Sequence, residues 1–240
     1  MENHLQNFLV IDIETVSGSE NIEELPPQLQ QHWEYKANTL KNPDEKTPKE
    51  LYQDRAAIYA EFGKVVVIGL AFFYEAKGKP ALRVKSMASH NEQILLLDFK
   101  NFIESKFDQY RLKLCAHNGK EFDFPYLCRR MLINDIKIPG PLNIAGKKPW
   151  EVPHIDTMEL WKFGDWKSFT SLNLLTTIFD IPSSKTDLDG SMVNKTYYEE
   201  KDGLERIEEY CRRDVIATAQ LYLRLNNLPL IEEQQIDVIT

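Results

Sequence analysis

One apolar run constrains the fold more than any other part of this sequence. From Lys64 to Tyr74 the chain reads Lys-Val-Val-Val-Ile-Gly-Leu-Ala-Phe-Phe-Tyr. A continuous run of apolar residues, rich in β-branched and aromatic side chains, favours a strand that is buried on both faces. A strand of that kind lies in the middle of a sheet with helices on either side. We therefore expect an α/β fold, with a mixed central β-sheet flanked by helices.

Further strands are expected around this central one. Phe8–Ile13 is apolar and predicts a buried strand near the N-terminus. A turn at Gly78-Lys-Pro80 predicts that Ala81–Met87 returns beside the central strand as a hairpin, with the first strand alongside. Two shorter extended segments are expected later in the chain, at Leu112–Ala116 and Ile155–Thr157.

The helical segments follow from apolar spacing and capping residues. Asn91 and Ser171 are typical helix caps, and each is followed by apolar residues at helical spacing. The longest helix is expected at Leu204–Leu225, where apolar residues recur at steps of three and four along one face. One further helix is expected after Asn91, with Leu95, Phe99, Phe102 and Ile103 as its inward stripe. The remaining expected helices are Phe122–Leu132, a short helix ending at Phe163, and Leu172–Phe179.

Two segments do not fit the α/β pattern. Ser17–Ala60 is polar and contains prolines, with a helix expected to open at Pro26-Pro27, a loop at Lys41–Pro48 and a second helix at Leu51–Phe62. We interpret it as a helical insertion that could act as a lid or substrate guide. The acidic segment after Pro229 is expected to be a loose tail. This gives one domain over residues 1–228 with the insertion at 17–60, followed by a tail at 229–240.

Composition limits the class of protein. The 240 residues are 42% hydrophobic, which suits one sizeable domain with a single core. The formal net charge of -8 argues against a protein that binds nucleic acid over its whole surface. It is compatible with a local basic groove. The three cysteines are too few and too dispersed for a disulfide framework or a zinc site. No signal peptide and no membrane-length apolar run is apparent, so a cytoplasmic protein is expected.

Carboxylates stand beside apolar residues in three short stretches. Asp12 and Glu14 are two apart on the expected first strand, so both side chains point to one face. Asp123 stands at the start of an expected helix, and Tyr210 and Asp214 are one helical turn apart. Each stretch alone has a simpler interpretation. Asp12 and Glu14 could face solvent at a strand end, and Asp123 could be favoured by the helix dipole. Asp214 could form a salt bridge to Arg212, Arg213 or another basic residue. Together, buried carboxylates at three such places would repel one another unless cations held them.

The three stretches resemble known motifs. Asp12-Ile-Glu-Thr15, His117-Asn-Gly-Lys-Glu-Phe-Asp-Phe-Pro-Tyr126 and Tyr210-Cys-Arg-Arg-Asp214 are similar to the three exonuclease motifs of the DEDD superfamily of 3′-5′ exonucleases, which have a ribonuclease H-like fold. That superfamily has a histidine and a tyrosine subgroup. The histidine would stand five positions before the last Asp, where this chain has Glu209. Tyr210, four positions before it, matches the tyrosine subgroup.

Within the tyrosine subgroup, the chain is most similar to stand-alone bacterial proteins related to the proofreading domain of family B DNA polymerases. Leu172–Phe179 followed by Asp189-Gly-Ser-Met-Val193 strengthens that closer match. The resemblance implies a metal-dependent exonuclease that releases nucleoside 5′-monophosphates from the 3′ ends of single-stranded DNA or RNA.

The resemblance also implies roles for individual residues. Two Mg²⁺ or Mn²⁺ ions would be held by hard oxygen ligands, which suit these ions. Asp12 would bridge both metals, Glu14 and Asp214 would bind the metal that activates water, and Asp123 would act on the other metal. Tyr210 would orient the attacking water. Four further residues are implied as substrate-binding: Thr15, His117, Asn118 and Phe122.

The sequence leaves several points open. Phe122, Phe124 and Tyr126 are candidates for stacking on bases, although at least two of them are expected in the core. Basic candidates for phosphate contacts are Lys120, Arg129, Arg130, Lys147, Lys148, Lys162 and Lys167. Asp156 is expected to be structural. The alternatives to an exonuclease are a non-catalytic nucleic-acid or partner-binding module on the same fold, and an endonuclease. A polymerase or repair partner could deliver the substrate.

Overall fold

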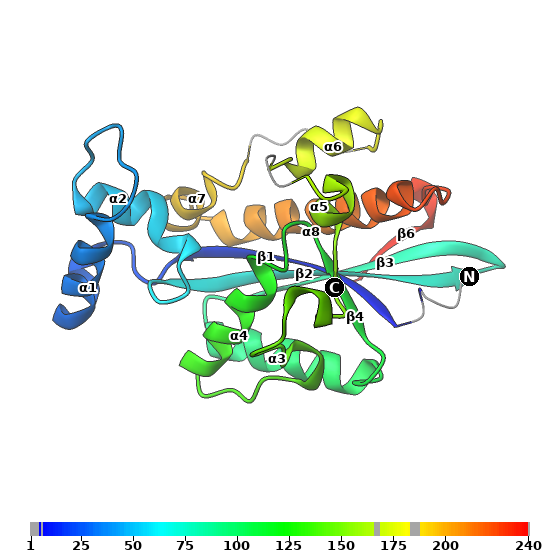
Figure 1. Cartoon of the computed structure of the whole chain (residues 1–240), viewed down its shortest axis with the longest axis horizontal. Helices are drawn as coiled ribbons and strands as arrows, with labels where there is room; N and C mark the ends of the chain where they lie inside the picture. Colours follow the sequence, from blue (N-terminus) through cyan, green and yellow to red (C-terminus); the bar gives the residue numbers. More distant parts are fainter. Residues whose placement is uncertain (1–4, 6, 166–168, 183–187, 240) are drawn as a thin grey trace.

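The protein is built on one six-stranded mixed sheet with helices on both faces (Figure 1). The computed structural model describes residues 5, 7–165, 169–182 and 188–239. The strand order is β5-β4-β1-β2-β3-β6. The strands are β1 Phe8–Ser17, β2 Gly63–Ala76, β3 Lys79–Ala88, β4 Lys113–Ala116, β5 Ile155–Asp156 and β6 Ile236–Ile239.

Strand direction divides the sheet into two parts. β1, β2 and β3 form an antiparallel meander, with β2 in the centre as the long apolar run predicts. β4 pairs parallel with β1, β5 pairs parallel with β4, and β6 pairs parallel with β3. The carboxyl ends of β1, β4 and β5 therefore point the same way, so the residues that follow these strands gather at one edge region of the sheet.

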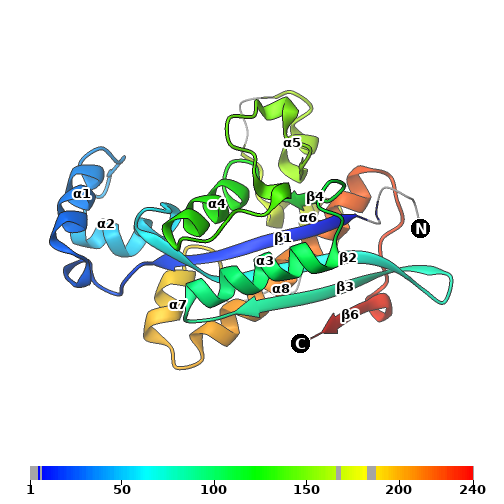
Figure 2. The same ribbon diagram turned by 90° about the horizontal axis from the view of Figure 1, so that it is seen from below.

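Helices cover the two faces separately, as Figures 1 and 2 show. α3 and α4 pack on one face, where Leu96, Phe99 and Leu127 join the largest cluster of buried apolar side chains. α8 crosses the other face and contacts β1, β2 and β3, with α5, α6 and α7 packed against it. These helices are α3 Glu92–Lys106, α4 Asp123–Ile133, α5 Thr157–Lys162, α6 Leu172–Ile178, α7 Val193–Glu199 and α8 Gly203–Leu225.

The alternation of side chains along β1 decides which residues face α8. Leu9, Ile11 and Ile13 are buried in the cluster beneath α3 and α4. Val10 and Val16, which have the opposite parity, are buried with side chains of α8. Because Asp12 and Glu14 share the parity of Val10, their carboxylates point toward α8.

The predicted insertion forms a helical lobe at one end of the sheet (Figures 1 and 2). It contains η2 Ile22–Glu24, α1 Pro27–Ala37, α2 Pro48–Arg55 and η3 Ala56–Ile58. Its own small core is built around Trp33, which packs edge-on against Tyr52 and Phe62. The start of α1 at Pro27 confirms the prediction, whereas the helix expected at Leu51–Phe62 ends at Arg55 and gives way to a 3-10 turn. The expected role of the insertion as a lid stays a prediction.

One helix was not predicted, and one other prediction about an element is wrong. α7 was not predicted, because a seven-residue helix gives only a short periodic signal. The segment after Pro229 is not loose: the N–H of Ile231 donates to Gln220 Oε1 (2.9 Å), and Ile236–Ile239 adds β6 to the edge of the sheet. Four residues of mixed polarity are too few for a strand signal in the sequence, and the pairing with β3 supplies the order.

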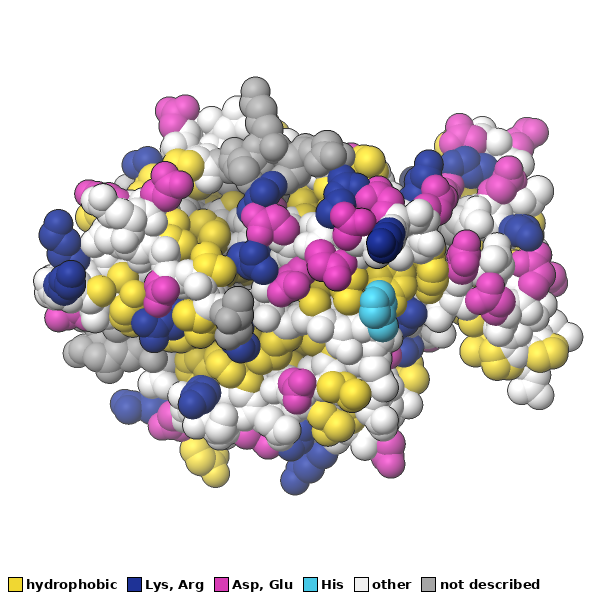
Figure 3. Space-filling model, turned by 180° about the vertical axis from the view of Figure 1, so that it is seen from behind, with side chains coloured by type: hydrophobic (Ala, Val, Ile, Leu, Met, Phe, Trp, Pro, Cys, Tyr) yellow, Lys and Arg dark blue, Asp and Glu magenta, His cyan; other side chains and the backbone are white. Residues whose placement is uncertain are grey.

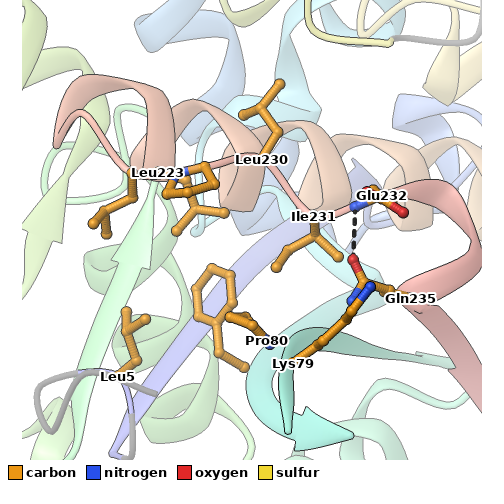
Figure 4. Close-up of a pocket in the computed structure, with 11 residues that line it drawn as sticks. Leu5, Lys79, Pro80, Leu223, Leu230, Ile231, Glu232 and Gln235 are labelled. Atoms are coloured by element: carbon orange, nitrogen blue, oxygen red, sulfur yellow. Dashed lines mark hydrogen bonds between the residues drawn. The ribbon is translucent and has the colours of Figure 1, made fainter. Parts of the chain in front are cut away.

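Two surface features lie outside the carboxylate region. A cavity of about 530 Å³ lies between the β2–β3 hairpin and the segment after α8, lined in part by Leu5, Leu223 and Ile231 (Figure 4). None of the predicted site residues lines it. On the face opposite to that of Figure 1, basic and acidic side chains are interspersed around exposed hydrophobic ones (Figure 3). Among the described residues, no helix is both long and apolar enough to cross a membrane.

Candidate active site

The first two carboxylates are held on β1 under α8. Glu14 is 8% exposed and Asp12 is partly buried. The register of β1 with β2 shifts between Glu14 and Thr15, so that Glu14 pairs with Val67 and Thr15 with Val65. A bulge of this kind bends a strand and redirects its side chains, and bulges are frequent beside functional sites. Here the bulge falls directly after the acid pair.

Asp123 reaches the same place from α4. β4 pairs with β1 only as far as Val10, so the backbone N–H of Ile13 lies beyond the paired stretch. That N–H donates to Asp123 Oδ1 at 3.1 Å. The carboxylate of Asp123, which is 3% exposed, therefore satisfies a backbone donor of β1 between Asp12 and Glu14.

α8 brings the third group of residues. Tyr210 and Asp214 are one turn apart, and the Tyr210 hydroxyl hydrogen-bonds the Asp214 carboxylate. Between them in the helix, the thiol of Cys211 lies 3.4 Å from Asp12 Oδ2 and 3.5 Å from the Asp12 carbonyl oxygen. A carboxylate oxygen of Asp12, a carboxylate oxygen of Glu14 and the sulfur of Cys211 all lie within 4.8 Å of one another. The structure thus brings residues from β1, α4 and α8 into one cluster.

A glycine lets the helix come this close. Gly69 of β2 is the cross-strand partner of Asp12. A Cβ at position 69 would lie 2.8 Å from Val215 Cγ1, 2.9 Å from Cys211 Sγ and 3.1 Å from the Cys211 carbonyl oxygen. Ordinary contacts between such atoms are about 3.5–4.0 Å. Only glycine at this position leaves room for α8 to rest on β2 beside Asp12.

Burial raises the pKa of all four acids, and repulsion by the other acids of the cluster adds to it for Asp12 and Glu14. Burial, followed by the neighbouring carboxylates, holds the pKa values of Asp12 and Glu14 well above their ordinary range. Burial raises the pKa of Asp123 to about 7, although the N–H of Ile13 opposes the shift. Burial raises the pKa of Asp214 to about 6, and the hydrogen bond from Tyr210 opposes it. Ionised together, these groups are unfavourable unless positive charge is added.

The donor set fits a hard divalent cation. Four carboxylates supply oxygen ligands of the kind that Mg²⁺ and Mn²⁺ prefer. Cys211 is a free thiol buried in the core, and its contact with Asp12 was not predicted from the sequence. Burial and the adjacent carboxylates hold the pKa of its thiol well above the ordinary range, so the group stays protonated and donates to Asp12. The only signal in the sequence was its place directly after Tyr210.

The second motif is fixed by Asp156. Its carboxylate accepts from the backbone N–H groups of Asn118 (2.9 Å), Lys120 (3.1 Å) and Met158 (2.9 Å). This confirms the prediction that Asp156 is structural. Asn118 adopts a left-handed backbone with φ of 64°, and its Oδ1 is buried without a hydrogen-bond partner among the described residues.

His117 is also held by protein groups. Its Nε2 donates to the Thr170 carbonyl at 2.8 Å, and its Nδ1 lies 2.9 Å from Thr157 Oγ1. Burial lowers the pKa of His117, which keeps the imidazole neutral. His117 thereby connects the end of β4 to the segments around α5 and α6. A substrate contact of His117 or Asn118 stays a prediction.

The aromatic candidates separate into core and surface. Phe124 and Tyr126 are fully buried, as expected for at least two of the three. The Tyr126 hydroxyl donates to the Ala57 carbonyl at 2.8 Å and is hydrogen-bonded by the Thr15 side chain. Thr15 is therefore engaged inside the protein, and its expected contact with substrate stays a prediction. Phe122 is half-buried beside Asp123 and is the one of the three still open to solvent.

The two arginines that neighbour Asp214 in the sequence pair with other acids. Arg212 pairs with Glu208 and Glu209 and also donates to Ser86 of β3, and Arg213 pairs with Glu209, so both arginines are engaged by other groups. Within the described part of the chain, no ion pair of Asp214 is found, and Glu209 is engaged away from the carboxylate cluster. The expected alternative of a salt bridge from Asp214 to Arg212 or Arg213 is therefore not formed.

The basic candidates differ in availability. The side chain of Arg130 is 12% exposed and pairs with Glu92, so it is not open to phosphate. Lys120 pairs with Glu159 at 2.7 Å. Arg129, Lys147 and Lys148 are exposed. Lys167 lies outside the described residues.

Comparison with known proteins shows the family to which the chain belongs. Residues 58–234 match the sequences described as a predicted 3′-5′ exonuclease related to the exonuclease domain of PolB. The chain belongs to this family of PolB-related predicted exonucleases. The matched range includes Asp123, Tyr210 and Asp214, whereas Asp12 and Glu14 precede it. No curated protein matches the chain.

A solved structure supports the fold of this family member. The family B DNA polymerase from the hyperthermophilic archaeon Pyrobaculum calidifontis matches with a TM-score of 0.54 and 14% sequence identity. The match covers 90% of this chain and 24% of the polymerase, so the chain spans about a quarter of that protein's length. It confirms the ribonuclease H-like fold predicted from the motifs and, at this identity, shows the fold alone.

Proposed function

We propose that this PolB-related exonuclease homologue hydrolyses phosphodiester bonds at the 3′ ends of single-stranded DNA or RNA and releases nucleoside 5′-monophosphates. The observation that carries the proposal is the convergence of Asp12, Glu14, Asp123 and Asp214 from three elements, with Tyr210 bonded to the last of them. Four acids that are buried or partly buried, with raised pKa values, have no structural benefit as a group. Their arrangement is explained by cation binding.

Asp12, Glu14, Asp123 and Asp214 would hold two divalent ions, Mg²⁺ or Mn²⁺. When bound, such ions activate water as a nucleophile and stabilise the charge that develops on the phosphoryl and leaving oxygens. Asp12 would contribute to holding the ions, because it lies close enough to Asp123 and Asp214 for their charges to raise its pKa. The bond from Ile13 fixes one oxygen of Asp123 and leaves the other available.

Tyr210 would orient the attacking water. Burial, together with the nearby Asp214, Glu14 and Asp12, raises the pKa of Tyr210 far above its ordinary value. The phenol therefore keeps its proton and acts as a hydrogen-bond donor and orienter, not as a general base. Cys211 would keep Asp12 in position through its contact with Oδ2.

The strand end would enter beside the second motif. Asn118 Oδ1 is buried and has no hydrogen-bond partner among the described residues. Because buried acceptors are usually hydrogen-bonded, this oxygen would accept a hydrogen bond from the substrate, such as one from a hydroxyl of the terminal sugar. Phe122 offers a partly exposed ring one residue before Asp123. The net charge of -8 also supports delivery of the substrate by a polymerase or repair partner.

The test is release of nucleotide from a 3′-labelled oligonucleotide in Mn²⁺, with the wild type compared with Asp12→Ala. Rapid release by the wild type and a loss of at least about 1000-fold in the variant are expected. Equal release by the two proteins would remove the assignment. A circular single-stranded substrate separates the endonuclease alternative, because an exonuclease finds no end to attack. Parallel DNA and RNA substrates decide between the two polymers.

A further inference from the structure

The exposed phenylalanine and tryptophan side chains are concentrated in one part of the chain, whereas exposed tyrosines also occur elsewhere. Every Phe or Trp that is exposed among the described residues lies between positions 150 and 169: Trp150 (77%), Phe163 (89%) and Phe169 (71%). Exposed apolar side chains of α5 and α6 accompany them, namely Leu160, Leu174 and Ile178. Isolated exposed apolar residues are normal, but a concentration of this kind marks an interaction surface.

This surface adjoins the candidate active site. Phe169 directly precedes Thr170, whose carbonyl accepts the hydrogen bond from His117. Phe163 directly follows Lys162, which is close enough to His117 to contribute to lowering its pKa. The backbone at both phenylalanines therefore lies next to residues that contact or approach the second motif. α5 and α6 lie over α8, the helix that carries Tyr210 and Asp214 (Figure 1).

The backbone at Phe163 is unusual. The residue ends α5 in the left-handed conformation, with φ of 44°. Gly or Asn is the common choice there, because a bulky side chain is strained in this region. A phenylalanine with a strained backbone and an almost fully exposed ring contributes little to the stability of the fold. Its presence is better explained by a contact with another molecule.

The charge of this part of the chain indicates which kind of molecule contacts the exposed rings. Residues 111–182 contain ten Lys and Arg against eight Asp and Glu, whereas the rest of the chain contains nineteen against twenty-nine. Within this stretch Glu159 is paired with Lys120, and Glu151 accepts from the backbone N–H of Lys148. Lys148 lies over the ring of Trp150 at 5.2 Å. Aromatic rings among lysines fit a polyanion with flat faces, and single-stranded nucleic acid has both properties.

We propose that Phe163 and Phe169 form a stacking surface for the bases of the single strand that leads to the scissile 3′ end. This rests on the proposed function, because it needs a strand whose end lies at the carboxylates. Stacking on rings is tolerant of base identity, so the surface would bind strands of any sequence. It would hold the nucleotides that precede the terminal one, while the acids and Asn118 hold the end itself.

The test is strand binding in the Asp12→Ala protein, which separates binding from turnover. Fluorescence anisotropy with labelled dT12 and dT3 gives the preference for the longer strand. Phe163→Ala and Phe169→Ala are each expected to weaken dT12 binding by about fivefold or more, from the usual contribution of base stacking, with a smaller effect on dT3. Tryptophan at either position restores the affinity. Tyr35→Ala and Tyr110→Ala, which remove exposed rings elsewhere, leave dT12 binding unchanged.

The outcomes separate the two proposals. Equal dT12 affinity in Phe163→Ala, Phe169→Ala and their parent overturns the stacking surface, whatever the activity. Equal losses in the Tyr35 and Tyr110 controls overturn it as well, because the effect is then not specific to this surface. Hydrolysis of the p-nitrophenyl ester of thymidine 5′-monophosphate by the protein with intact Asp12 tests the carboxylates alone. Failure of that reaction counts against the proposed function and leaves the binding result to decide the stacking surface. Circular dichroism confirms that each variant is folded.

Discussion

Replacement of Gly69 by alanine tests the assembly of the site directly. The new Cβ would lie 2.8 Å from Val215 Cγ1 and 2.9 Å from Cys211 Sγ. Since ordinary carbon contacts are about 3.5–4.0 Å, α8 must move away from β2 by about 0.7–1 Å. Overpacking of this size costs about 1–3 kcal/mol in the free energy of unfolding.

The activity should fall further than the stability. Tyr210 and Asp214 immediately precede Cys211 and Val215 on α8, so a shift of the helix carries them away from Asp12 and Glu14. A displacement of about 1 Å in a catalytic constellation costs on the order of 100-fold in rate. We therefore expect Gly69→Ala to lose about 10- to 100-fold in kcat/KM and to bind Mn²⁺ more weakly, at temperatures where it remains folded.

The assay combines urea unfolding with Mn²⁺ titration and release from a labelled oligonucleotide. Gly140→Ala is the matched control, because its new Cβ would have only Gln109 Oε1 within 4 Å, at 3.9 Å. In Gly69→Ala/Val215→Ala one close contact is removed, so part of the activity should return relative to Val215→Ala alone. Wild-type stability and wild-type kcat/KM in Gly69→Ala would refute the reasoning, because α8 would then not depend on the missing Cβ.

Three further predictions follow from the buried charges. In EDTA, stability should fall as pH rises from about 4 to about 7, because the unfolded acids ionise near pH 4 while Asp123 holds its proton until about pH 7. Thermal melting should show this fall, and the fall should be smaller in Asp123→Asn, where the other three acids still contribute. A flat wild-type profile would contradict the prediction. Tyr210→Phe should lower kcat by about 10- to 100-fold with little change in KM, measured by steady-state release; an equal rise in KM would point to substrate binding instead. Arg130→Met should cost about 3–5 kcal/mol in urea unfolding, because Glu92 is left buried without its partner, and a change below 1 kcal/mol would show that the pair contributes little.

Local patterns were sufficient for most of the elements. β2 was predictable because a continuous apolar run rich in β-branched and aromatic residues favours a strand buried on both faces. Asn91 and Ser171 cap their helices as predicted, since each side chain accepts a backbone N–H three residues on. α7 and β6 were not predictable, because seven and four residues carry too little periodicity. Their positions depend on packing against α8 and pairing with β3.

The sequence by itself determined which residues could form the site. Alternation on β1 put Asp12 and Glu14 on one face, and helical spacing put Tyr210 one turn before Asp214. Both relations depend on the geometry of a single element, so they can be read without knowing the fold. The motif resemblance then related the three stretches to one another.

Only the tertiary structure decided how the site is assembled. The bond from Ile13 to Asp123 exists because β4 stops pairing with β1 at Val10, and the approach of Cys211 to Asp12 exists because Gly69 has no side chain. Both depend on distances between segments far apart in the chain, which no local pattern encodes. The exposure of Phe163 and Phe169 is equally a tertiary property, because an aromatic residue in a sequence is expected to be buried until its surroundings are known.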